Sequence, residues 1–187
     1  MFAAFTIKKR LTIWAGIVLA ILFFPLILTV NGSHVDGQGW HWTVSDFAFI
    51  FIVLLGSAVV FELVARKMHT RAHRIALAAS VLSGLLLVYI NAAVGIIGED
   101  NPGNLMYPGV IVLGLIVAAV GRFTAQAIIR ALLVMATTLF IVTMVTPIFF
   151  SRFEPSPWKT VALDAMFIIF FLGSIQLFRQ AERQGRK

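Results

Sequence analysis

The sequence contains no cysteine and few charged residues. Without cysteine, the chain has no disulfides, thiolate metal sites, cysteine nucleophiles or cysteine-bound iron–sulfur clusters. Charged residues make up only 12% of its 187 positions, whereas a soluble domain carries about a quarter. Hydrophobic residues make up 60%, which is more than a soluble domain of this size can bury. We therefore expect the chain to lie in a lipid bilayer.

The sequence also lacks the common catalytic and nucleotide-binding motifs. It has no HExxH, P-loop or dinucleotide-binding pattern and no Gly-x-Ser-x-Gly elbow. A haem held between spans would need histidine at membrane depth. The four histidines lie in or beside predicted connections: His34, His41, His69 and His73. We therefore expect no cofactor and no bound metal.

Long apolar runs dominate what is present. A spanning helix needs about 20 mainly apolar residues, and the runs are continuous rather than alternating, which favours helices over a barrel. The connections between them are short, so we expect one transmembrane domain over residues 1–187. The sequence predicts an all-α, polytopic transmembrane helical bundle with six spans, at about 11–30, 44–64, 75–97, 105–121, 129–149 and 160–178.

The lysines and arginines are divided very unequally between the two sets of connections. Thirteen lie in the N-terminal end, the second and fourth connections and the C-terminal tail, and only Arg152 and Lys159 lie on the other side. Basic residues in short loops mark the cytoplasmic side, so both termini are predicted to be cytoplasmic, in a multi-pass inner (plasma) membrane protein. The net charge of +7 is then explained by topology and by attraction to anionic headgroups, and no nucleic acid partner is expected.

Two aspartates lie near the predicted outer ends of spans. Asp46 and Asp164 occur in the similar segments TVSDFAFIF and TVALDAMFIIF, each preceded by a tryptophan. Both spans run from outside to inside, so each acid is predicted about one turn inside a helix N-terminus, where the helix dipole favours negative charge. Asp46 and Asp164 are therefore interpreted as charges that stabilise helix ends. In a second interpretation, the two acids form a paired outer site for a cation or proton.

Two further polar residues fall inside spans. Glu62 lies four residues before Arg66, in the order that favours an ion pair on one helix face, and an ion-conducting carboxylate is the alternative. Asn91 lies at hydrocarbon depth, where its amide needs partners on neighbouring helices. Asn91 is interpreted either as a residue whose interhelical hydrogen bond holds helices together or as part of the lining of a polar cavity.

The predicted reversal between the third and fourth spans is rich in oxygen-bearing side chains. Residues 91–107 read NAAVGIIGEDNPGNLMY, with turn-forming residues at the centre. Acidic and amide oxygens suit hard cations, but the spacing does not match that of an EF-hand. The run AVGIIGEDNPGNLMY, with Asp46-Phe47 and Glu62 before it, resembles a signature of a family of small bacterial integral membrane proteins of uncharacterised activity. The resemblance covers about residues 42–110 and implies a bacterial inner-membrane setting without a reaction.

Two classes of function fit these observations. The first is a small transporter, channel or accessory membrane subunit with an outer acidic and amide site, because the outer side carries a net charge of −4 that would attract cations. The alternative is a membrane enzyme acting on a lipid or quinone at the outer face, with His41, Asp46, Glu99 and Asp100 as its acid–base candidates. The expected partners are the bilayer and a small cation or lipid, and a homo-oligomer or a larger membrane complex fits the sequence. The candidate site comprises Asp46, Asn91, Glu99, Asp100, Asn101, Asn104 and Asp164.

Overall fold

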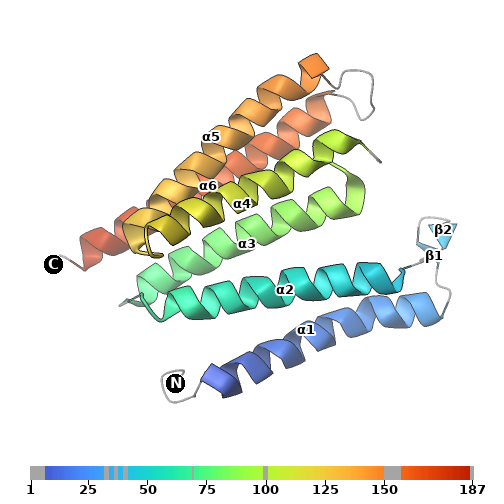
Figure 1. Ribbon diagram of the computed structural model, residues 1–187, viewed down its shortest axis with the longest axis horizontal. Coiled ribbons are helices and arrows are strands. Elements are labelled where there is room, and N and C mark those ends of the chain that lie inside the picture. Colours follow the sequence, from blue (N-terminus) through green and yellow to red (C-terminus); the bar gives the residue numbers. More distant parts are fainter. Residues whose placement is uncertain are drawn as a thin grey trace. The chain divides into compact units, whose positions relative to one another are not determined.

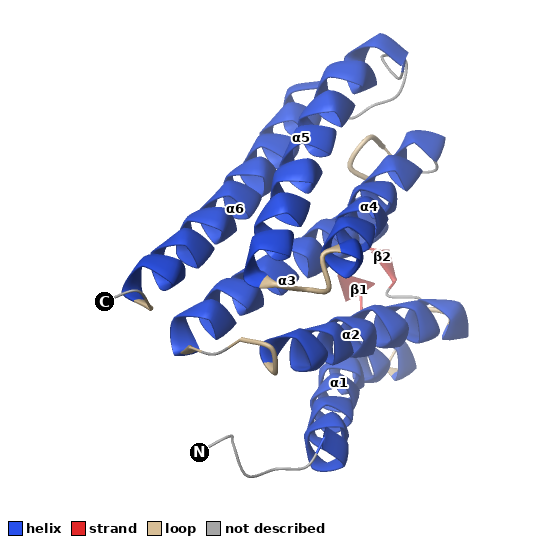
Figure 2. Cartoon of the chain, turned by 60° about the vertical axis from the view of Figure 1, so that its left-hand side comes forward, coloured by secondary structure: helices blue, strands red, loops and turns tan. Residues whose placement is uncertain are grey.

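The computed structural model describes residues 7–31, 34–35, 38–39, 42–68, 70–98, 101–149 and 157–185. Six long helices account for nearly all of them (Figure 1). Two strands of two residues each, β1 (His34–Val35) and β2 (Gln38–Gly39), pair antiparallel between the first two helices (Figure 2). The helices are α1 (Ile7–Val30), α2 (Val44–Ala65), α3 (Arg71–Val94), α4 (Met106–Val120), α5 (Ala125–Phe149) and α6 (Pro157–Gln184).

All six helices, α4 together with the short 3₁₀ helix η1 (Pro102–Leu105) that precedes it, are long and apolar enough to cross a membrane. The shortest span, Pro102–Val120, has 19 residues and would extend about 29 Å at 1.5 Å per residue, which matches the hydrocarbon thickness of about 30 Å. The predicted all-α polytopic bundle with six spans is therefore confirmed. The protein is an integral membrane protein.

Several predicted helix boundaries differ from the structure, and three of them bear on the candidate site. The third span was expected to reach residue 97, but α3 ends at Val94 because Gly95 adopts φ +58°, a left-handed conformation that stops a helix. The fourth was expected to begin near Leu105, whereas η1 leads directly into α4, so Tyr107 lies in the first turn. The sixth was expected to begin at Thr160, but α6 begins at Pro157, and proline is well suited to the first turn.

The chain divides into two compact units, residues 1–62 and 63–187. In the first unit, α1 and most of α2 form a hairpin whose small core contains Val18, Leu22 and Ile50. Near the other end of this hairpin, Arg10 of α1 donates to Glu62 of α2 at 2.9 Å. The prediction that the whole chain forms one domain stays a prediction.

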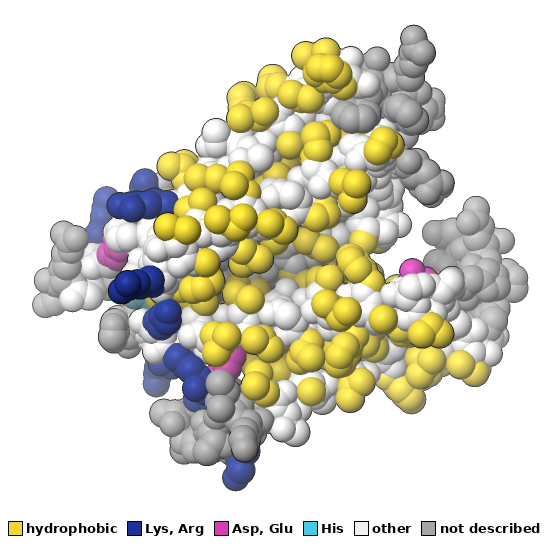
Figure 3. Space-filling model, viewed as in Figure 1, with side chains coloured by type: hydrophobic (Ala, Val, Ile, Leu, Met, Phe, Trp, Pro, Cys, Tyr) yellow, Lys and Arg dark blue, Asp and Glu magenta, His cyan; other side chains and the backbone are white. Residues whose placement is uncertain are grey.

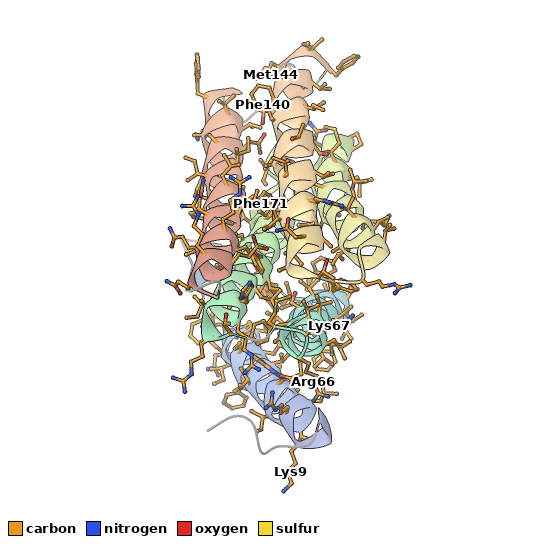
Figure 4. All side chains as sticks on the ribbon, turned by 90° about the vertical axis from the view of Figure 1, so that its left-hand side faces the viewer. Lys9, Arg66, Lys67, Phe140, Met144 and Phe171 are labelled. Carbon is orange, nitrogen blue, oxygen red and sulfur yellow. The ribbon has the colours of Figure 1, made fainter. Side chains whose placement is uncertain are left out.

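The second unit is a four-helix arrangement in which α3 packs against α4 and α6, and α5 packs against α4 and α6. The buried face of α6 follows positions three and four residues apart, as expected for one helix stripe. Phe171, labelled in Figure 4, lies in the middle of this stripe and is fully buried. The buried residues of α6 are Thr160, Asp164, Phe167, Phe171, Ser174, Ile175, Phe178 and Ala181. Thr160 and Asp164, the two polar residues of this stripe nearest the start of α6, are therefore buried between helices.

The two ends of the second unit differ in chemistry. We call the end where α3 stops and α4 and α6 begin the asparagine end, because Asn91, Asn101 and Asn104 lie there. Lysine and arginine side chains gather at the opposite end, where α3 begins and α6 stops (Figure 3). The helix surfaces between the ends are largely apolar (Figure 3), as expected for surfaces that face lipid.

Candidate functional site

Asp46 closes the N-terminus of α2 and lies in the first unit. Its Oδ2 accepts from the backbone N–H of Thr43 at 2.7 Å and from the Thr43 hydroxyl at 2.8 Å. The Asp46 N–H in turn donates to Thr43 Oγ1 at 3.3 Å. This reciprocal pair is a capping box, which satisfies two helix-end donors. Asp46 is exposed to the surroundings of the chain, so its interpretation as a helix-end charge is confirmed.

Three predicted site residues, Asn91, Asn101 and Asn104, come together at the asparagine end of the second unit. Asn104 accepts from the Ile97 N–H at 3.0 Å and donates to the Gly98 carbonyl at 2.7 Å. Asn91 donates from Nδ2 to the Asn104 carbonyl at 3.1 Å. Asn91 therefore ties the end of α3 to the start of the next span, as the packing interpretation of its amide predicts.

Asn101 completes this turn. Its Oδ1 accepts from the Gly103 N–H at 2.8 Å and so caps η1. Gly95 allows the chain to fold back, because a Cβ there would lie 2.6 Å from the Gly98 carbonyl oxygen. The side-chain amides of Asn101 and Asn104 thus satisfy backbone groups inside one tight turn, which gives both residues a structural role. Asn91 Oδ1 is buried and has no partner among the described residues.

Two predicted site residues, Glu99 and Asp100, lie outside the described residues. Within the described part of the chain, no group of three or more His, Cys, Asp or Glu side chains could hold a metal ion.

Asp164 is placed differently from the prediction. It was expected about one turn inside the helix, as an N-terminal charge, but the first turn of α6 contains no acidic residue. Because α6 begins at Pro157, Asp164 lies seven residues further on, or about 10 Å along the axis. Its side chain is fully buried. The helix-end interpretation is therefore wrong for Asp164, although it is right for Asp46.

Two hydroxyl groups from other helices surround Asp164. Thr143 of α5 approaches Asp164 Oδ2 at 2.9 Å. Tyr107 of α4 is also fully buried, and its hydroxyl interacts with the same carboxyl group. Neither Tyr107 Oη nor Asp164 Oδ1 has a partner with strict hydrogen-bond geometry among the described residues. The site therefore consists of one carboxyl group and two hydroxyl groups, and two of their oxygen atoms, Asp164 Oδ1 and Tyr107 Oη, lack such a partner.

The sequence did not identify Tyr107 and Thr143 as site residues. Tyr107 marks only a doubtful span boundary in the sequence, and Thr143 is one threonine among several in a long apolar run. A further clue is Pro147 within α5, which lacks the N–H that would normally bond to the carbonyl of Thr143 four residues earlier. A proline in a span whose preceding turn carries a hydroxyl is the one signal that could have drawn attention to Thr143.

Thr160 links the Asp164 site to the asparagine turn. It lies one helical turn before Asp164 on the same stripe of α6, and its hydroxyl donates to the Ile96 carbonyl at 2.9 Å. Ile96 belongs to the turn that Asn104 and Asn101 hold together. The start of α6 and this turn are therefore joined, which places Asp164 and the three asparagines at one end of the second unit.

The buried acids Asp164 and Glu62 differ in their counter-charge. Glu62, in the first unit, faces the Arg10 guanidinium, a partner that the sequence-based pairing with Arg66 did not include. Among the described residues, no Lys, Arg or His forms an ion pair with Asp164. A buried carboxylate without a counter-charge is costly, and a bound cation or a proton would remove that cost.

Comparison of the chain with protein-family models, with curated proteins and with solved structures found no match.

Proposed function

We propose that this protein moves a proton or another monovalent cation across the membrane, and that Asp164 is the residue at which the ion is held. One observation carries the proposal. A fully buried acid lies in a membrane-spanning helix, and the described residues supply hydroxyl groups and no positive charge around it. Acids in spans are costly and usually mark ion pathways.

The surroundings of Asp164 support an exchangeable ion rather than a structural role. A buried acid with a structural role has its oxygen atoms satisfied, and even the exposed Asp46 has its Oδ2 hydrogen-bonded in a helix cap. Asp164 Oδ1 and Tyr107 Oη lack partners with good geometry. Pro147 also releases the Thr143 carbonyl from its helical bond. Interrupted helices with free carbonyls are typical of ion sites in transporters.

The proposed membrane and orientation follow from charge. The bias of thirteen basic residues against two puts the basic end of the second unit in the cytoplasm, with both chain termini on that side. The asparagine end and Asp164 would then lie towards the outer face of a bacterial inner membrane, where the negative loops attract cations. The bacterial setting comes from the family resemblance of about residues 42–110 and is part of the proposal.

The enzyme alternative receives no support from the described residues. Its acid–base candidates were His41, Asp46, Glu99 and Asp100. Asp46 serves as a helix cap, and the other three lie outside the described residues.

Cation entry into vesicles tests the proposed function. The purified chain is reconstituted into lipid vesicles that contain a pH-sensitive dye or a sodium-sensitive dye, and a potassium diffusion potential with negative interior drives cations inward. We expect entry above that of protein-free vesicles for the wild type and for Asp46→Asn, and entry at the protein-free rate for Asp164→Asn. A wild type without entry of either ion, or an Asp164→Asn variant as fast as the wild type, would contradict the proposal.

A further inference from the structure

The hydroxyl of Thr143 lies between two oxygen acceptors. It is 2.9 Å from the Leu139 carbonyl within α5 and 2.9 Å from Asp164 Oδ2 on α6. A threonine hydroxyl carries a single hydrogen. If Asp164 is ionised, both neighbours of Thr143 only accept, and one of these two contacts between oxygen atoms is left without a hydrogen.

A proton on Asp164 Oδ2 supplies the hydrogen that is missing from one of these two contacts. The acid O–H then donates to Thr143 Oγ1, and the Thr143 O–H donates to the Leu139 carbonyl. Both 2.9 Å contacts become hydrogen bonds with one hydrogen each. Binding forms the O–H bond of a carboxylic acid and breaks an O–H bond of a hydronium ion on the side from which the proton enters, which leaves a water molecule there.

The second carboxyl oxygen favours the same state. Asp164 Oδ1 has no hydrogen-bond partner among the described residues. In an ionised carboxylate this oxygen carries about half of the negative charge, and burying it without a donor is expensive. In the neutral acid it is an ordinary carbonyl oxygen, for which an incomplete interaction with the Tyr107 hydroxyl costs much less.

Among the residues that the structure describes, no charged or titratable group near Asp164 takes the place of the proton. From α4 the facing group is Tyr107, and from α5 it is the neutral Thr143. Arg71, His73 and Arg74 of α3 and Arg130 of α5 lie at the basic end of the second unit. Tyr89, the other titratable residue of α3, is exposed. Lys159 of α6 is exposed and lies five residues before Asp164, which is about 140° around the helix.

A metal cation fits this arrangement poorly. A cation that enters a dry site needs several oxygen ligands to replace its hydration shell. In the described part of the chain, the side chains that reach Asp164 are those of Thr143 and Tyr107, each with one hydroxyl group. The Thr143 hydroxyl already lies between two oxygen acceptors, the Leu139 carbonyl and Asp164 Oδ2. One proton satisfies these contacts without further ligands.

We infer that the ion held at Asp164 is a proton, bound to Oδ2 and hydrogen-bonded to Thr143. This inference rests on the proposed function, because it names the ion that the proposed pathway carries. Asp164 is accordingly a neutral acid in the conformation described, and release of its proton requires the contact with Thr143 to change.

Infrared spectroscopy of the full chain in lipid, with isotope-labelled aspartate, tests this inference. We expect a protonated-acid C=O band at neutral pH that disappears in Asp164→Asn and does not change when choline replaces sodium. Thr143→Val should shift the band. Thr146→Val is the matched control, because Thr146 is a buried threonine on the same helix that donates to the Val142 carbonyl at 2.8 Å, and it should leave the band in place.

The outcomes separate the inference from the proposed function. A spectrum without this band at neutral pH, or a band that sodium removes, overturns the proton inference, while sodium entry into vesicles would still support cation movement. A band with the expected behaviour, in a protein that admits no cation under a potential, supports the bound proton and overturns the proposed function. If Asp164→Asn does not fold, the shift in Thr143→Val against Thr146→Val still assigns the band.

Discussion

Asp46 and Asp164 occur in similar sequences and have opposite surroundings. Asp46 follows a tryptophan by four residues and Asp164 follows one by six. Asp46 is the third residue of its helix and closes a capping box at its exposed end. Asp164 is the eighth residue of its helix, is fully buried, and contacts hydroxyl groups of two other helices. Asp164 lies five residues further along its helix than Asp46 does, which amounts to about 140° of rotation and about 7.5 Å along the helix axis.

The comparison shows that the position of an acid along its helix decides what the acid can do. In the first turn, a carboxylate meets unpaired N–H groups and a favourable dipole, so its charge stabilises the helix. Beyond the first turn those N–H groups are used by the helix itself. An acid there must find partners on other helices or carry a proton, which is why Asp164 is the candidate for function and Asp46 is not.

The largest expected difference between the two positions comes from reversing the charge. Asp164→Lys would bury a cation among apolar groups and hydroxyls, and we expect it to lower the free energy of unfolding by about 3 kcal/mol or more. Asp46→Lys would lose the cap and place positive charge at a helix N-terminus, at a cost of about 1 kcal/mol. Reversible unfolding in mixed micelles measures both. Equal losses would show that the two acids have the same environment.

A smaller effect is expected from removing the cap. Asp46→Ala leaves the Thr43 N–H without its acceptor, and we expect a loss of about 1 kcal/mol. Ser45→Ala is a suitable control, since Ser45 lies on the same exposed turn and contacts only the Thr43 hydroxyl in the described hydrogen bonds. If the two variants unfold alike, the capping box contributes nothing measurable.

The smallest effect on stability is expected at the proposed functional residue. Asp164→Asn keeps the size of the side chain and can accept from Tyr107 or donate to Thr143, so we expect its free energy of unfolding to remain within about 1 kcal/mol of the wild type. The same micelle experiment measures it. A loss as large as that of Asp164→Lys would indicate that the acid maintains the fold and would weaken its assignment to ion binding.

Much of the fold follows from the sequence because it depends on local properties. Length and hydropathy located all six spans, and the turn-forming residues between 98 and 104 located the reversal where Asn101 and Asn104 now lie. Asp46 was interpreted correctly because a cap depends on residues three positions apart. Asn91 was expected to bond outside its own helix, and its amide does so at the Asn104 carbonyl.

The rest of the site depends on packing between distant residues. Tyr107 and Asp164 are 57 positions apart, and Arg10 and Glu62 are 52 apart, so no local pattern pairs them. Hydrophobic periodicity gives little help in a span that is apolar on every side, because lipid-facing and buried positions share the same residue types. The depth of Asp164 was underestimated because α6 begins three residues earlier than its apolar run.

The most direct test of the account compares two conservative variants in one assay. The measurement is the initial rate of cation entry driven by a membrane potential, for Asp164→Asn relative to Asp46→Asn, in vesicles that contain equal amounts of folded protein. With Asp164 as the ion-binding residue and Asp46 as a helix cap, the ratio is predicted to be close to zero. A ratio close to one would contradict the central claim that the buried acid, and not the exposed one, holds the ion.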